Sequence, residues 1–241
     1  LYTSQSLLMI VCDGMGGHVG GEIASQFVVD YLANAYKQVA KPKVNDPLSF
    51  MKKSIASANA ALIQYAKSKN YPEVPRTTCV AVLVQDGKMQ WINVGDSRIY
   101  HIRNDEVVLK TIDHSQVQQM VEAGVITEQE AKKHKDRNKI YNCIGQSAPP
   151  KIDVEQDIVL KPNDCVLLAT DGLWGPIGNT MLEGTFNTMP TSIALPWLMD
   201  LAESTTGKGC ENLSGIAFKW LEDGAAASKI ERVDEPTKVV F

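Results

Sequence analysis

The most informative part of the sequence is LLMIVCDGMGGHVGGEIAS, residues 7–25. Its apolar run predicts a buried strand over Leu7–Cys12. The strand runs directly into Asp13 and a glycine-rich loop, and apolar residues spaced three or four apart then predict a helix over Gly21–Val39. A carboxylate at the end of a buried strand needs a partner, because an unpaired charge near a protein interior is costly. This stretch therefore predicts a strand–loop–helix unit that presents an acidic group.

The composition is that of an ordinary globular protein. The 241 residues are 44% hydrophobic and 22% charged, which is enough chain for one large domain or two small ones. The formal net charge of -4 favours neither nucleic acid nor an anionic membrane surface as a partner. No apolar run is long enough to span a bilayer, and the first residues lack the layout of a signal peptide.

The cysteines favour a reducing compartment. There are 5, an odd number, widely spaced and without a C-x-x-C pair, which argues against a disulfide framework and against a zinc site. We therefore expect a cytoplasmic protein. Cys12, Cys79 and Cys165 lie in apolar, strand-like runs and are expected to act as small core residues.

The order of the expected elements indicates an α+β fold. Helices come first, then several hairpin-connected strands, then mixed elements, with no regular β-α-β alternation. Residues 222–241 are polar and alanine-rich and are expected to form a tail or linker after one domain over residues 1–221. The further expected helices are Pro47–Lys69, Gln116–Gly124, Thr127–Lys135 and one that starts near Pro196. The further expected strands are Thr77–Gln85, Lys88–Val94, Arg98–Ile102, Val107–Thr111, Val154–Leu160, Cys165–Thr170 and Leu213–Trp220.

Acidic residues recur at the ends of the expected strands. Asp13, Asp96 and Asp171 each follow an apolar strand, and Glu211 stands just before the last one. Neighbouring carboxylates repel one another unless a cation neutralises them, and oxygen ligands suit magnesium or manganese rather than zinc. Two such ions can clamp the attacking and leaving oxygens of a phosphoryl transfer. Each position alone has a plainer interpretation: Asp-Gly is a common turn, Asp96 can pair with Arg98, and ENLS can be a cap.

Five motifs in order give the chain a family resemblance. They are DGMGGHVGGEIAS, NVGDSRIYHI, TIDHS, LLATDGLWG and ENLSGIAF, and the resemblance that they carry covers Leu7 to Trp220. In this order the motifs resemble those of the metal-dependent protein serine/threonine phosphatases of type 2C, in the form found in the bacterial branch. The resemblance implies a four-layer α-β-β-α sandwich with two central antiparallel sheets and a metal site at one end. It also implies residues 123–145 as a flap beside the cleft.

The same resemblance implies the residues of the site and its reaction. Asp13 would bridge two Mg²⁺ or Mn²⁺ ions, the Gly14 carbonyl oxygen would bind one of them, and Asp171 and Glu211 would supply further carboxylates. Asp96 would bind a third, weaker ion. Asp13 and Asp171 would thus be the catalytic residues in the hydrolysis of phosphoserine or phosphothreonine in proteins. The substrate would be a protein phosphorylated by a bacterial Ser/Thr kinase.

Three positions depart from the family pattern. The segment LYTSQS holds neither the arginine nor the acidic residue that family members carry upstream of DGMGG. Glu211 stands where the family has aspartate, and Arg76 stands where it has glycine. The absent arginine and Glu211 favour an alternative, a regulatory pseudophosphatase that binds a partner without turnover, whereas Asp13, Asp96 and Asp171 favour the active enzyme. The sequence also leaves open a metal-dependent hydrolase of a small phosphoester.

Other residues invite a catalytic interpretation that the sequence does not favour. Asp113, His114 and Ser115 contain the residue types of a catalytic triad, but adjacent residues cannot face one another in that geometry, so we expect a structural element. His18 is expected to pack or hydrogen-bond in the glycine loop rather than to act as a general acid. The basic segment KKHKDRNK, residues 132–139, is expected to be a solvated face rather than a guide for acidic substrates.

Overall fold

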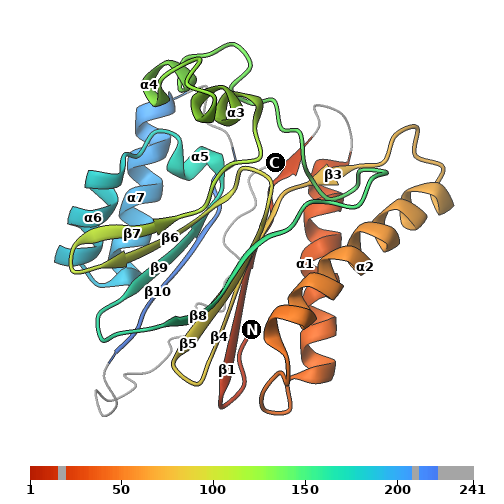
Figure 1. Cartoon of the computed structure of the whole chain (residues 1–241), viewed down its shortest axis with the longest axis horizontal. Coiled ribbons are helices and arrows are strands. Elements are labelled where there is room, and N and C mark those ends of the chain that lie inside the picture. Colours follow the sequence, from red (N-terminus) through yellow and green to blue (C-terminus); the bar gives the residue numbers. More distant parts are fainter. Residues whose placement is uncertain (16–19, 208–211, 222–241) are drawn as a thin grey trace.

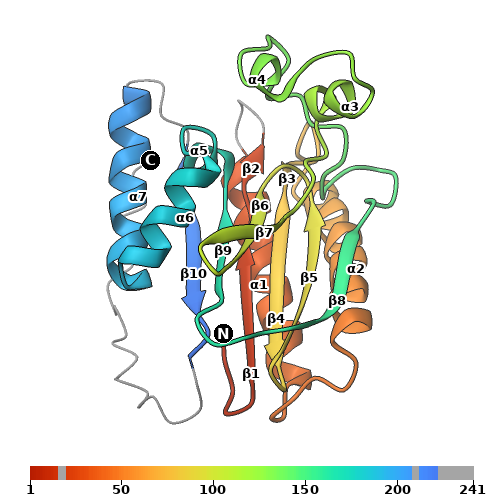
Figure 2. The same cartoon turned by 60° about the vertical axis from the view of Figure 1, so that its left-hand side comes forward.

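The computed structural model describes residues 1–15, 20–207 and 212–221. Its elements form four layers, in which two antiparallel sheets lie face to face between two layers of helices (Figures 1 and 2). The helices are α1 (Gly21–Val39), α2 (Pro47–Ser68), α3 (Gln116–Glu122), α4 (Glu128–Ala131), α5 (Asp171–Trp174), α6 (Asn179–Thr188) and α7 (Thr191–Thr206). The strands are β1 (Ser6–Val11), β2 (Gly14–Met15), β3 (Arg76–Thr77), β4 (Cys79–Gln85), β5 (Lys88–Val94), β6 (Arg98–Arg103), β7 (Glu106–Lys110), β8 (Asp153–Val159), β9 (Cys165–Ala169) and β10 (Gly215–Lys219).

The two sheets have the strand orders β1-β4-β5-β8 and β10-β9-β6-β7, and β2 and β3 form a small separate ribbon. Local chemistry sets the β4–β5 hairpin. Asp86 and Gly87 both have positive φ, 54° and 69°, as a two-residue turn between twisted strands requires. The resulting register places Val84 opposite Met89 and carries the pairing back to Cys79 and Val94.

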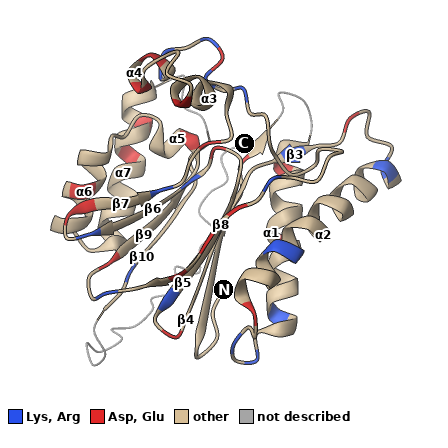
Figure 3. Cartoon of the chain, viewed as in Figure 1, with Lys and Arg blue, Asp and Glu red and all other residues tan. Residues whose placement is uncertain are grey.

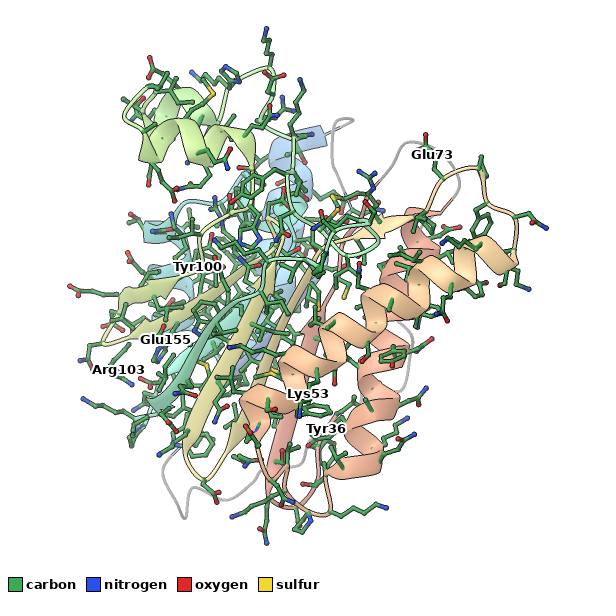
Figure 4. The ribbon with its side chains drawn as sticks, turned by 45° about the vertical axis from the view of Figure 1, so that its right-hand side comes forward. Tyr36, Lys53, Glu73, Tyr100, Arg103 and Glu155 are labelled. Atoms are coloured by element: carbon green, nitrogen blue, oxygen red, sulfur yellow. The ribbon has the colours of Figure 1, made fainter. Side chains whose placement is uncertain are left out.

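The apolar residues form three packed layers between the four layers of structure. Inward-facing residues of both sheets, among them Val82 and Leu168, fill the centre of the sandwich. On one outer side α1 and α2 cover the first sheet, and on the other α5, α6 and α7 cover the second. Tyr36 reaches from α1 to the first strand, where its hydroxyl donates to the carbonyl oxygen of Ser6 at 3.0 Å (Figure 4).

The two long helices begin and end where their sequences predict. Residues spaced four apart, Ala24, Val28, Leu32 and Tyr36, form the buried stripe of α1. The α2 helix begins with Pro47 in its first turn, after an Asp46 side chain that accepts from the Ser49 amide at 3.1 Å. No helix within the described ranges is long and apolar enough to cross a membrane.

The predicted α+β sandwich is confirmed, and several local predictions are wrong. The α7 helix begins at Thr191 rather than near Pro196, which lies inside it. The first turns form because Ala194 is buried against the second sheet, a tertiary gain that outweighs the hydrogen bond lost at proline. Helices α5 and α6 and strands β2 and β3 were not predicted. The expected helix over Thr127–Lys135 is only the single turn α4.

Candidate active site

Three of the predicted acidic residues lie at the same end of the sandwich. Asp13 follows β1 and Asp96 follows β5, and these two strands run in the same direction because both pair antiparallel to β4. Asp96 lies where the chain crosses from the first sheet into β6 of the second. There Arg98 pairs with Ala169, the last residue of β9, and Asp171 follows two residues later. Strand topology therefore brings together residues that are far apart in the sequence.

The backbone of Asp13 is held by two threonines. The Thr78 amide and the Thr77 hydroxyl both donate to the Asp13 carbonyl oxygen, each at 2.8 Å, and the Asp13 amide donates to Thr78 Oγ1 at 3.0 Å. Thr78 Oγ1 also lies 2.7 Å from Ser97 Oγ. Thr78 thus links the end of β1 to the loop that carries Asp96. Sequence reasoning missed this role, and its only signal was a pair of threonines just before an apolar strand.

The glycines around Asp13 allow a close strand–helix approach. A Cβ on Gly14 would lie 2.1 Å from the carbonyl oxygen of Gly21, and a Cβ on Gly21 would lie 2.9 Å from the Gly14 backbone. Glycine at Gly14 and Gly21 therefore lets the start of α1 approach the backbone that follows β1. The backbone of Gly21 fills the space beside Gly14, so close packing alone explains why residue 14 is a glycine. The role of the Gly14 carbonyl oxygen as a metal ligand stays a prediction.

Asp96 is a buried carboxylate without a cationic side-chain partner within ion-pair distance among the described residues. It is 6% exposed. Burial is the main cause that raises its pKa to about 8, and the nearby carboxylates of Asp171 and Asp113 contribute to this rise. Its carbonyl oxygen accepts from Trp174 Nε1 at 3.0 Å, which fixes the loop against α5. The ionised form of Asp96 therefore needs a positive charge beside it.

Arg98 does not supply that charge as a direct partner. Its Nε and Nη2 donate to the two carboxylate oxygens of Asp113, each at 2.7 Å, and Nη1 donates to the Tyr100 hydroxyl at 3.2 Å. The guanidinium carbon lies 3.4 Å from the centre of the Trp174 ring. The simple Asp96–Arg98 ion pair considered from the sequence is therefore wrong. The Asp113 carboxylate raises the pKa of Arg98, so this arginine stays charged.

Asp113, His114 and Ser115 face three different partners, as expected of a structural element. Asp113 binds Arg98, and the Ser115 side chain accepts from the Gln118 amide at the start of α3. His114 is 1% exposed, accepts from the Gly95 amide at Nδ1, and places Nε2 3.0 Å from Asp153. The rejection of a catalytic triad is confirmed, because no serine–histidine contact exists within this motif.

A cavity of about 490 Å³ opens beside Asp96 and Asp171. The α3–α4 segment lies over it, and α5 closes another side (Figures 1 and 2). Asp13 is not among the residues that line it. The charged lining residues are Asp96, Arg98, Lys110, Asp113, Glu128, Lys132, Arg137 and Asp171.

The described residues carry part of an oxygen donor set for a metal. Among residues 1–15, 20–207 and 212–221, no three His, Cys, Asp or Glu side chains lie close enough to hold an ion. Glu211 and His18 lie outside the described residues, so their predicted roles are untested. The chemistry of the remaining donors nevertheless fits a hard divalent cation. A positive charge beside Asp96 and Asp171 would remove the repulsion that raises the Asp96 pKa.

The fold and these residues define a class: an α+β sandwich with carboxylates gathered at one end. The chain belongs to the protein phosphatase 2C family, whose model matches residues 2–205. It is 31% identical over 178 residues to the serine/threonine phosphatase stp of Listeria innocua, covering 73% of this chain and 70% of the relative. The structure resembles that of serine/threonine phosphatase Stp1 from Staphylococcus aureus, with 30% identity, a TM-score of 0.82 and coverage of 92% and 86%. It also resembles the catalytic domain of the phosphatase PstP in complex with 2 manganese ions, with 27% identity, a TM-score of 0.75 and coverage of 89% and 88%.

Proposed function

We propose that this chain hydrolyses phosphoserine and phosphothreonine in proteins with the aid of two or three Mg²⁺ or Mn²⁺ ions. The observation that carries the proposal is the buried carboxylate of Asp96, which lines a cavity with Asp171 and has a pKa of about 8 without a cation. Family membership and a manganese-bound relative support the same activity. The metal ligands would be Asp13, the Gly14 carbonyl oxygen, Asp96, Asp171 and Glu211.

The chain's own residues would fix the geometry of the reaction. Divalent ions, when bound, would activate a water molecule and offset the charge of the phosphoryl oxygens. Thr77 and Thr78 hold the Asp13 backbone in place. Trp174 holds the Asp96 backbone. Such fixed donors reduce the reorganisation that the reaction would otherwise require.

A covalent cysteine intermediate has no suitable residue among the described ones. The thiol of Cys12, next to Asp13, has a pKa well above its usual range because it is buried and faces Cys79 and the Asp13 carboxylate. Burial likewise raises the pKa of Cys165 to about 12. Direct attack by water on phosphorus therefore suits this site better than thiolate catalysis.

The proposal extends to the place of the enzyme in the cell. We propose residues 1–221 as the catalytic domain, and the tail or linker expected over residues 222–241 lies outside the described residues. The five cysteines favour the cytoplasm. The phosphorylated substrate protein would come from a bacterial Ser/Thr kinase.

The test compares hydrolysis of a phosphothreonine peptide by the wild type and by Asp171→Asn, with and without Mn²⁺. We expect activity that requires Mn²⁺ and falls at least about 100-fold in the variant, because one carboxylate of the site is lost. Asp200→Asn, an exposed position on α7, is the matched control and should keep full activity. A wild type that binds Mn²⁺ weakly and hydrolyses nothing would support the pseudophosphatase instead. Faster hydrolysis of nucleotides than of phosphopeptides would indicate a small-phosphoester hydrolase.

A further inference from the structure

The cavity beside Asp96 and Asp171 has a charge distribution that the metal site does not explain. Its inner end carries the carboxylates of Asp96 and Asp171, and its outer end carries Lys132 and Arg137, which belong to the basic segment that follows α4, residues 132–139. Figure 3 shows basic residues in blue within this segment. A site for a phosphoryl group alone would need no cations on the far side of the cavity.

Two of the other cations in the lining already have carboxylate partners. Arg98 is bound by both oxygens of Asp113. Lys110 Nζ lies 4.0 Å from the Glu128 carboxylate, a weak pair at the surface. Arg98 is therefore compensated within the protein, and Lys110 is compensated only weakly.

Lys132 and Arg137 differ in this respect. Within the part of the chain that the structure describes, neither forms an ion pair, whereas nearby Lys139 lies 2.9 Å from Asp136. Both line the cavity, although they belong to a basic run whose members Lys133 and Lys135 do not. Two uncompensated cations thus face the same space as the proposed reaction centre.

The backbone that carries these cations is fixed. A capping box at the start of α4 joins Thr127 and Glu130 through reciprocal hydrogen bonds of 2.7 Å and 3.2 Å. After Arg137, the Lys139 carbonyl oxygen accepts from the Gln116 amide at 2.9 Å. The segment is therefore anchored at both ends, and its cations have a defined place relative to the cavity.

We propose that Lys132 and Arg137 form a subsite for acidic side chains of the substrate, so that the enzyme prefers phosphopeptides with Asp or Glu near the phosphorylated residue. This inference rests on the proposed phosphatase function. A peptide whose phosphoryl group lies at the inner carboxylates, with metal bound, would extend its neighbouring side chains toward these two cations. Opposite charges there would favour binding and speed encounter, and salt would weaken both effects.

The test uses three phosphothreonine peptides of equal length, with glutamates before the phosphoresidue, glutamates after it, or glutamines at all these positions. We expect the wild type to hydrolyse one acidic peptide with a kcat/KM about three- to tenfold above that of the neutral peptide. The preference should decline between low and high ionic strength. p-Nitrophenyl phosphate, which does not reach the subsite, serves as the reference substrate.

Charge reversal gives the matched comparison. In Lys132→Glu with Arg137→Glu, the ratio of kcat/KM for the preferred acidic peptide to kcat/KM for the neutral peptide should fall to one or below, with hydrolysis of p-nitrophenyl phosphate showing that the protein is folded and active. Lys133→Glu with Lys135→Glu changes the net charge equally on the same segment but outside the cavity, and should keep the preference.

Two results would overturn the inference: equal kcat/KM for all three peptides in the wild type, or an equal loss of preference in both double variants. In either case hydrolysis of the neutral peptide would leave the proposed phosphatase function intact. Failure to hydrolyse any substrate with Mn²⁺ would instead refute the proposed function. The two failures are therefore distinguishable.

Discussion

The buried carboxylate of Asp96 leads to a quantitative prediction for the metal-free protein. Its folded-state pKa of about 8 lies above the value of 3.8 that it has in water. The unfolded chain therefore releases this proton at a lower pH than the folded protein does. Between these two pKa values the folded state keeps a proton that the unfolded state has lost, so rising pH destabilises the metal-free fold.

The size of the effect follows from the pKa difference. Each pKa unit corresponds to about 1.4 kcal/mol, so Asp96 alone lowers the unfolding free energy by about 4 kcal/mol between pH 5 and pH 8. Asparagine has nearly the shape of the protonated carboxyl and cannot ionise. The Asp96→Asn variant should therefore exceed the wild type in stability, by an amount that grows by about 4 kcal/mol over this range.

Urea unfolding at pH 5, 6, 7 and 8 in the presence of a chelator measures this difference directly. Asp200→Asn, at an exposed position, should show a constant difference from the wild type across the series. Saturating Mn²⁺ should reverse the order, because the ion stabilises a wild-type site that still has its carboxylate. A stability difference for Asp96→Asn that is the same at every pH would refute the reasoning.

Two further predictions concern the supports of the site. Gly14→Ala places a methyl group within 2.1 Å of the Gly21 carbonyl oxygen and should lower the unfolding free energy by about 3 kcal/mol or more, measured by thermal or urea unfolding. Gly184→Ala is its control: nothing lies within 4 Å of the added Cβ in α6, so this variant should be more stable by about 1 kcal/mol. Trp174→Phe removes the 3.0 Å bond to the Asp96 carbonyl oxygen and should lower kcat/KM about tenfold. Its unfolding midpoint should fall by only a few degrees, and an unchanged kcat/KM would show that this bond does not position the loop.

Local sequence chemistry predicted the elements whose signals are local. The α1 and α2 helices follow from apolar spacing and from the Asp46–Pro47 start, and the β4–β5 hairpin follows from Asp86 and Gly87. Elements that depend on the rest of the molecule were missed. The α5 helix follows a strand end that reads as a turn, and the start of α7 is set by burial against a sheet.

The acidic residues were found because the same pattern, a carboxylate at the end of an apolar strand, recurs along the sequence. Asp13, Asp96 and Asp171 all stand at such positions, and the structure brings all three to one end of the sandwich. The groups that hold them were not found. Thr78 contacts a residue 65 positions away and Trp174 one that is 78 positions away, and no local pattern marks either pairing.

The charge state of the site shows why such long-range contacts matter. From the sequence, Arg98 lies two residues after Asp96 and is its obvious partner. In the fold the guanidinium instead binds Asp113, which arrives from the connection between β7 and α3, and stacks on Trp174. Because Arg98 pairs with Asp113, the Asp96 carboxylate stays buried near Asp171 and Asp113 without a direct cationic partner among the described residues. Burial and these two carboxylates raise its pKa. A local ion pair would have neutralised Asp96 and removed its need for a cation, so the distant Arg98–Asp113 pair leaves this carboxylate without a direct cationic partner in the described part of the chain, as the proposed metal site requires.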